Sequence, residues 1–302
     1  LVALMGFALE HSRQRAHQQL VEKIRQLEEK ERIISLQNQK METDLLMARE
    51  LQMAMLPTTI SASAGGAAPT DLQLRLVRRY RPLATVGGDF FHVFPLSEAK
   101  EGVLICDAMG HEVRSALVTA MLRALTESLR TVAESPGLMM SRINDDMCNV
   151  LEQVGDVMFA TAMYLVIDRR ERVVRFARAG HHEAVLLRRR TGEIKKLPDE
   201  LRSNQPALGL FKSVGYATQM SALQPEDVIV LFTDGLFEVM GRDQQELGME
   251  KILDLLGREM NVKTDVLFDD LINQVLAYSE SGSFSDDVCL VGIEMSENPG
   301  VD

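Results

Sequence analysis

The hydrophobic positions in the first part of the chain follow the seven-residue spacing of a coiled coil. From His17 to Met55 there is no glycine or proline to interrupt a helix. Apolar residues recur at alternating steps of four and three, which aligns them along one stripe of a left-handed supercoil. The pattern predicts a long helix that forms a homodimer through a coiled coil. The first set of seam positions is apolar throughout and comprises Leu20, Leu27, Ile34, Met41, Ala48 and Met55.

The second set of seam positions is interrupted by the polar residues Glu31, Asn38 and Gln52. Polar residues in a seam lower the stability of a coiled coil but fix its register and strand number. The alternative is a single amphipathic helix that folds back on a globular domain. Such a helix is expected to show a hydrophobic period closer to 3.6 residues, so the pattern favours the coiled coil.

The rest of the chain alternates strand-like and helix-like runs. Pro57 ends the helix because it has no N–H to donate, and the small residues that follow are typical of a linker. We therefore expect a helical segment at 1–56, a linker at 57–70 and a globular domain at 71–296. The runs predict an α+β fold of layered sheets and helices. Strands are expected at 72–80, 102–107, 160–168, 173–179, 184–189, 228–233 and 288–294, and helices at 115–132, 138–154, 249–259 and 265–279.

The first nine residues, 1–9, are apolar and are followed by His11, Arg13 and Arg15. A bilayer needs about 20 apolar residues, so this stretch cannot cross one by itself. It is either the cytoplasmic end of a membrane helix that starts upstream, with the basic residues on the inside, or an ordinary helix start. The first interpretation predicts a membrane tether before Leu1.

The composition of the chain limits the classes of ligand that it is expected to bind. The net charge of −11 argues against a nucleic-acid ligand, because phosphate backbones call for a basic surface. The three cysteines, Cys106, Cys148 and Cys289, are far apart and lack the spacing of zinc ligands. We interpret them as buried thiols in a reducing compartment, which indicates a cytoplasmic location.

The candidate functional residues are aspartates that lie beside apolar, strand-like runs. Asp107 and Asp234 each end such a run, Asp89 follows two glycines, and the pair Asp286-Asp287 precedes the last strand. A carboxylate at the end of a buried strand is unfavourable unless something pairs with it. Few basic residues lie beside them, so cations are the expected partners. Ligands that are all oxygen favour Mg²⁺ or Mn²⁺, although an Asp-Gly after a strand is by itself typical of a turn.

The order of these motifs resembles the protein phosphatase 2C-like domain of the stage II sporulation protein E and stress-response sigma-factor regulator type. The resemblance runs from about residue 48 to 295. It includes the segment from Ala48 to Pro57 that precedes the domain. The matching motifs are Gly87-Gly88-Asp89, Asp107-Ala108-Met109-Gly110-His111, Ala179-Gly180-His181, Thr233-Asp234-Gly235 and Asp286-Asp287.

The resemblance implies an α-β-β-α sandwich with a centre of two Mn²⁺ or Mg²⁺ ions, or three, between its sheets. Asp107 would bridge two ions and the carbonyl of Ala108 would bind one of them, with Asp89 and Asp107 as the catalytic residues. Asp89, Asp234, Asp286 and Asp287 would be the other metal-site residues, with Asp286 favoured over Asp287 as the direct ligand. The implied reaction is hydrolysis of a phosphoserine or phosphothreonine by direct attack of a water that the ions activate. The implied substrate is a phosphorylated STAS-domain anti-sigma-factor antagonist in a signalling partner switch.

Two departures from the family pattern bear on activity. His92 stands where many relatives have a second aspartate, and Glu112 stands where a glycine often follows the histidine of the second motif. His111 and His181 are either catalytic acids or structural residues that bond the backbone. Two other functions stay open. One is a catalytically inactive binding domain of the same fold, and the other is a two-metal phosphodiesterase that uses the same carboxylates.

Overall fold

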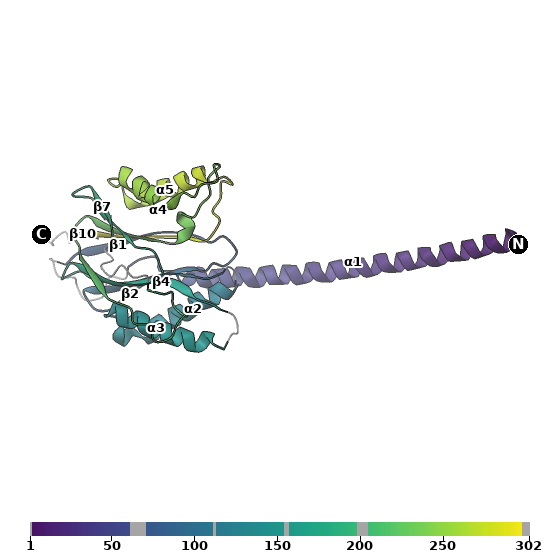
Figure 1. The fold of residues 1–302 in the computed structure, drawn as a ribbon, viewed down its shortest axis with the longest axis horizontal. Coiled ribbons are helices and arrows are strands. Elements are labelled where there is room, and N and C mark those ends of the chain that lie inside the picture. The colour runs from purple at the N-terminus through teal and green to yellow at the C-terminus, as the bar shows by residue number, and fades with distance from the viewer. Residues whose placement is uncertain (1, 61–70, 111–112, 154–156, 198–204, 298–302) are drawn as a thin grey trace. The chain divides into compact units, whose positions relative to one another are not determined.

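The computed structural model describes residues 2–60, 71–110, 113–153, 157–197 and 205–297 (Figure 1). None of the helices in these ranges combines the length and apolarity that a membrane span requires. The side chains of residues 1–9, on which the membrane interpretation depended, lie outside the described part of the chain. Most of the predicted linker at 57–70 lies outside it as well.

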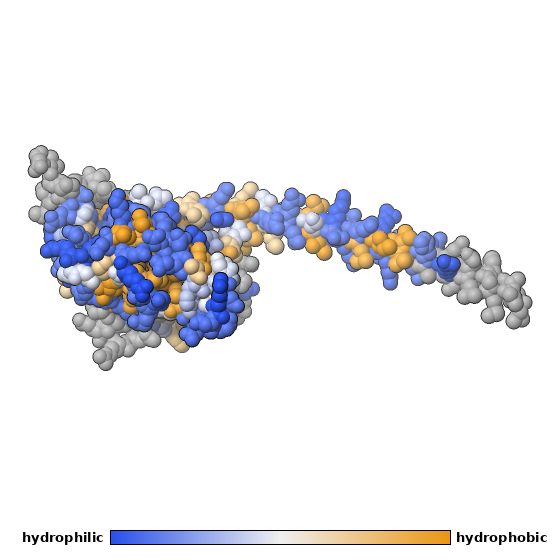
Figure 2. Space-filling model, turned by 90° about the horizontal axis from the view of Figure 1, so that it is seen from above, coloured by the Kyte–Doolittle hydropathy of each residue, from blue (hydrophilic) through white to orange (hydrophobic). Residues whose placement is uncertain are grey.

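The long N-terminal helix is present as α1, Val2–Met55. The chain divides into two compact units, Leu1–Arg49 and Glu50–Asp302, so the last turn of α1 belongs to the second unit. In the first unit the apolar seam residues of α1 face solvent, and hydrophobic side chains recur along it (Figure 2). An exposed apolar stripe on an isolated helix is unfavourable in water. Pairing of α1 in a coiled coil stays a prediction. Four seam residues have more than half of their surface exposed: Leu20, Leu27, Ile34 and Met41.

Two antiparallel sheets of five strands each form the centre of the second unit. Sheet A has the order β1-β10-β9-β6-β7 and sheet B the order β2-β3-β4-β5-β8. The strands of sheet A are β1 Gln73–Arg81, β10 Val288–Ser296, β9 Asp227–Phe232, β6 Val185–Arg188 and β7 Glu193–Lys196. Those of sheet B are β2 Asp89–Pro95, β3 Lys100–Ala108, β4 Ala160–Asp168, β5 Val173–Ala179 and β8 Gln219–Ala222.

Helices cover the outer face of each sheet and complete the predicted α-β-β-α sandwich (Figure 1). Helices α2 (Val113–Ser128) and α3 (Pro136–Leu151) pack on sheet B, with the short helix η1 (Arg130–Val132) between them. Helices α4 (Gly248–Arg258) and α5 (Thr264–Tyr278) pack on sheet A. The expected fold class is therefore confirmed.

The last strand shows how the sequence builds these layers. Successive side chains of a strand point to opposite faces. In β10, Cys289 and Val291 join the hydrophobic core between the sheets, whereas Val288 and Leu290 join the core under α4 and α5. Burial on both faces explains why β10 reads as a nearly continuous apolar run.

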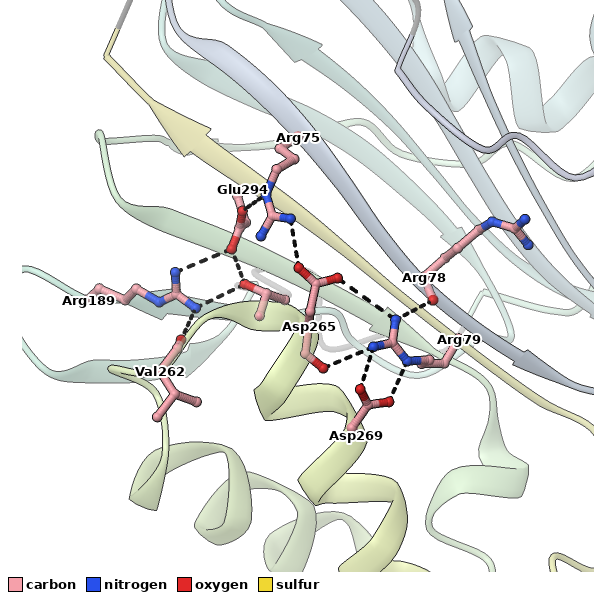
Figure 3. Close-up of polar contacts among 9 residues, drawn as sticks. Arg75, Arg78, Arg79, Arg189, Val262, Asp265, Asp269 and Glu294 are labelled. Carbon is pink, nitrogen blue, oxygen red and sulfur yellow. Dashed lines mark hydrogen bonds and ion pairs between the residues drawn. The ribbon is translucent and has the colours of Figure 1, made fainter.

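Charged side chains fix the start of α5 onto sheet A (Figure 3). Arg79 of β1 donates to both carboxylate oxygens of Asp269, at 2.7 and 2.8 Å. Arg75 bridges Asp265 of α5, at 2.8 Å, and Glu294 of β10. Arg189, in the turn between β6 and β7, donates to the carbonyl oxygen of Val262 at 2.8 Å and to that of Met260 at 2.7 Å. Bidentate arginine–carboxylate pairs of this kind set orientation as well as affinity.

Candidate metal centre

Sheet B supplies the first pair of carboxylates. Asp89 begins β2 and Asp107 lies near the end of β3, and the two residues are direct partners in the antiparallel register. Side chains of directly opposed residues point to the same face of a sheet. The backbone N–H of Ala108 donates to the carbonyl of Gly88 at 3.0 Å, which ties the two strand ends together. A side chain at Gly88 would clash, because its Cβ would lie 2.6 Å from the carbonyl oxygen of Ala108.

Sheet A supplies the second group. Asp234 begins the short helix η2 (Asp234–Leu236) two residues after the end of β9, and Asp286-Asp287 directly precede β10. These segments meet because β9 and β10 are neighbouring antiparallel strands. A Cβ at Gly235 would lie 2.0 Å from the carbonyl oxygen of Asp287, so only glycine permits this approach. The Asp-Gly motif is therefore required by close packing as well as by a turn.

A hydrogen bond joins the two groups across the sandwich. The hydroxyl of Thr233, one residue before Asp234, donates to Oδ2 of Asp89 at 2.5 Å. The same hydroxyl accepts the backbone N–H of Cys289 in β10 at 2.8 Å. The carbonyl of Asp89 accepts a hydrogen bond from the hydroxyl of Tyr80 in β1 at 3.1 Å. Asp89 is thereby fixed to sheet A although its backbone belongs to sheet B.

Two side chains from distant parts of the sequence hold the loop that leads into Asp89. Asp287 accepts the N–H of Leu83 at Oδ1 and that of Gly88 at Oδ2, both at 2.6 Å. Gln52, in the last turn of α1, donates to the carbonyl of Gly87 at 2.8 Å and accepts its N–H at 3.1 Å. Gln52 is only 3% exposed. Its polarity serves this buried contact within the second unit.

Burial and the closeness of the carboxylates raise the pKa values of three aspartates at this site. Burial, with repulsion from Asp107, raises the pKa of Asp89 well above its ordinary value. Burial also raises the pKa of Asp107 to about 7, and repulsion from Asp234 and Asp286 adds to the effect. The pKa of Asp234 is raised by burial and by Asp286. Among the described residues, no ion pair with arginine or lysine includes Asp89, Asp107, Asp234 or Asp286.

This donor set fits hard divalent cations. The pKa values of Asp89, Asp107 and Asp234 rise because these carboxylates are buried and because neighbouring carboxylates repel them, and a bound cation would oppose both effects. Among the described side chains, no three acidic, histidine or cysteine groups lie close enough together to enclose an ion by themselves. Mg²⁺ suits such an open arrangement, since it keeps several waters and usually takes one or two carboxylates.

The structure separates His92 from the carboxylates. Asp89 bonds Thr233 of sheet A, whereas His92, three residues further along β2, lies 3.2 Å from Glu127 of α2 and stacks on Phe94. Side chains three apart on a strand point to opposite faces. The residue at this position therefore faces α2 and not the carboxylates, so we expect no metal ligand at His92. His111 and Glu112 lie outside the described residues.

The sequence pattern assigned no role in the site to four residues that contact or face its carboxylates or their loop. Thr233 and Tyr80 bond Asp89, and Gln52 holds Gly87. Glu238 is near enough that repulsion contributes to the raised pKa of Asp107. Gln52 follows the heptad spacing and was interpreted as a seam residue, although it also lies in the segment from Ala48 to Pro57 that resembles the family. Glu238 lies one helical turn beyond Asp234, which is a spacing that could have indicated it.

Comparison with known proteins places this geometry in a family. The family model of stage II sporulation protein E (SpoIIE) matches residues 97–296. The phosphoserine phosphatase RsbP of Bacillus subtilis is 22% identical over 253 residues, which are 83% of this chain and 58% of RsbP. The chain thus spans little more than half the length of this curated relative.

Solved structures show the same fold. The SiaA-PP2C domain of Pseudomonas aeruginosa superposes with a TM-score of 0.71 at 21% identity, covering 85% of this chain and 98% of that domain. The catalytic domain of the serine/threonine protein phosphatase PstP, solved with two manganese ions, gives 0.52 at 18% identity, covering 74% and 99%. The family model covers well over half of the residues, and these structures have the same sandwich. The chain therefore belongs to the stage II sporulation protein E (SpoIIE) family.

Proposed function

We propose that the chain is a Mn²⁺- or Mg²⁺-dependent protein phosphatase that hydrolyses phosphoserine or phosphothreonine. The observation that carries the proposal is the meeting of Asp89 and Asp107 from sheet B with Asp234 and Asp286 from sheet A, without a basic partner among the described residues. Carboxylates gathered in this way are unfavourable unless cations bind. Phosphoryl transfer is the chemistry that a pair of such cations serves best.

The side chains divide into ligands and supports. Asp107, the carbonyl of Ala108, Asp89, Asp234 and Asp286 would hold two ions, or three. When bound, the ions would offset negative charge on the phosphoryl group and favour attack by water. Asp89 and Asp107 are the proposed catalytic residues. The family resemblance and the two manganese ions of PstP support this assignment.

Asp287 has a different role in this proposal. Both of its oxygens already accept backbone N–H groups, from Leu83 and Gly88. Its side chain is buried, whereas that of Asp286 is exposed at the same end of β10. We assign Asp286 as the ligand and Asp287 as the residue that positions the loop before Asp89.

The proposed substrate is a phosphorylated STAS-domain anti-sigma-factor antagonist, and the enzyme is a homodimer through α1. The name of RsbP, a phosphoserine phosphatase, supports the phosphoserine chemistry. The exposed seam residues of α1 support the dimer.

Phosphate release from a phosphorylated STAS protein of the same genome, with and without Mn²⁺, tests the proposal. We expect release only with Mn²⁺, and loss of it in Asp107→Asn and Asp234→Asn, while circular dichroism shows an unchanged fold. If either variant kept near wild-type turnover, the metal assignment would be wrong.

The same preparation decides between the two alternatives. Binding of the phosphoprotein without phosphate release at saturating Mn²⁺ would identify an inactive binding domain. Cleavage of single-stranded nucleic acid, with no action on the phosphoprotein, would identify a phosphodiesterase.

A further inference from the structure

The chain crosses from sheet B to sheet A through a short segment that contains His181. Strand β5 of sheet B ends at Ala179, and β6 of sheet A begins at Val185. Gly180 has a φ of 68°, which glycine adopts without strain. A Cβ there would press on Ala207 at 3.1 Å. The turn at Gly180 directs the next side chain, His181, into the space between the sheets, where it is 3% exposed.

Each ring nitrogen of His181 bonds a different sheet. Nδ1 lies 2.9 Å from the hydroxyl of Thr161 in β4, and Nε2 lies 3.1 Å from the carbonyl oxygen of Phe232 in β9. A carbonyl can only accept, so Nε2 carries the proton, and Nδ1 then accepts from the Thr161 hydroxyl. Burial keeps the pKa of His181 well below its ordinary value, so the ring stays neutral.

Both contacts lie beside the candidate metal ligands. Thr161 is the direct register partner of Asp107 in sheet B. Phe232 is the last residue of β9, two residues before Asp234 in sheet A. The imidazole thus spans the two strand ends that carry Asp107 and Asp234. A centre held between two sheets depends on their separation, because ligand distances tolerate only small errors.

We propose that His181 is a positioning residue that joins Thr161 to the Phe232 carbonyl and so sets the separation of Asp107 and Asp234 for metal binding. The proposal rests on the phosphatase function proposed above. It also excludes His181 as an acid that reaches the substrate, because both ring nitrogens are occupied inside the sandwich.

His182 offers a matched control. It is a neighbouring imidazole that stacks on His181 at 4.4 Å between ring centroids and lies tilted against Phe232 at 4.6 Å. Its Nε2 is buried and has no hydrogen-bond partner among the described residues. His182→Phe therefore removes a neighbouring, partly buried imidazole without removing a bond between the sheets.

Mn²⁺ binding to the full chain, measured by isothermal titration calorimetry, tests the proposal independently of turnover. Wild type is measured first, and absence of Mn²⁺ binding would overturn the proposed function itself. We expect His181→Phe to raise the dissociation constant by roughly ten-fold or more, as loss of a residue that orients metal ligands does. His182→Phe should bind Mn²⁺ like wild type. His181→Gln keeps a donor for the Phe232 carbonyl and should fall between.

The Thr161 hydroxyl gives a second test that avoids the histidine. Thr161→Val should weaken Mn²⁺ binding, and the double variant with His181→Phe should bind no more weakly than His181→Phe alone, because the shared bond is already lost. Unchanged Mn²⁺ affinity in His181→Phe and in Thr161→Val, even with lower melting temperatures, would reduce His181 to a core residue and overturn the inference. If the losses of Mn²⁺ affinity in the two single variants added up fully in the double variant, the proposal that His181 and Thr161 act through one shared bond would also be wrong.

Discussion

At the scale of single residues, the carboxylates of the candidate centre destabilise the metal-free protein. The pKa values of Asp89, Asp107 and Asp234 are raised by burial and by repulsion from neighbouring carboxylates, with that of Asp107 at about 7. An acid whose pKa is raised by folding binds its proton more tightly in the native state. The unfolded chain loses this proton near the ordinary value of 3.8, so the metal-free protein loses stability as the pH rises from about 4 to about 7. A carboxylate held by a salt bridge has the opposite effect, because it adds stability as the pH rises.

The sign leads to a prediction for Asp107→Asn. Without metal at pH 8, this variant should melt at a higher temperature than wild type, because the neutral amide removes the repulsion at little change in volume. The difference should shrink as the pH falls towards 4. Thermal melts in a chelator across this pH range check it. A less stable variant at pH 8 would mean that the repulsion is already relieved in the metal-free protein.

At the scale of elements, the last turn of α1 is joined to the loop that leads into Asp89. Gln52 pairs with both backbone groups of Gly87, and Leu56 is buried in the core between the sheets. A change in the packing of α1 at this turn would therefore act on the loop two residues before Asp89. This contact gives the last turn of α1 a physical route to the candidate site.

We expect Gln52→Ala to weaken Mn²⁺ binding and lower turnover. The change leaves a buried N–H and carbonyl at Gly87 unsatisfied, which costs about 1–3 kcal/mol, and this cost falls on the conformation of the loop. Gln37→Ala is the control, because Gln37 is an exposed glutamine of the same helix. Mn²⁺ titrations of phosphatase activity compare the two. Equal Mn²⁺ dependence in both variants would show that the loop holds its shape without α1.

At the scale of the whole molecule, the oligomeric state depends on the exposed part of α1. We predict that the full chain is a dimer at tens of micromolar and that a chain starting at Glu50 is a monomer, because the apolar seam lies mostly before Glu50. The shorter chain must begin before Gln52, since a start near residue 70 would remove Gln52 and Leu56 from the folded unit. Light scattering on both chains measures their molar masses. A monomeric full chain would contradict the predicted coiled coil.

The sequence by itself determined the layers of this protein and the acidic motifs between them. Buried strands such as β9 and β10 and helices with one apolar face carry their periodicity locally, so most were predicted within a few residues of their observed bounds. Three strands were not predicted. Strands β7 and β8 are four residues long and partly polar, and they form because a neighbouring strand is present. Strand β2 begins with an aspartate and ends with a proline, and its residues were interpreted as a motif.

Only the tertiary structure decided how the side chains of the site divide their work. Asp286 and Asp287 are adjacent in sequence, yet the side chain of Asp286 is exposed, whereas that of Asp287 holds the loop before Asp89. From the sequence, His181 was either a catalytic acid or a structural residue, and Gln52 was a seam residue. Only the structure shows their partners in other elements. Hydrogen bonds between residues far apart in sequence depend on the separation of the sheets and the direction of each side chain, and neither is encoded in local periodicity.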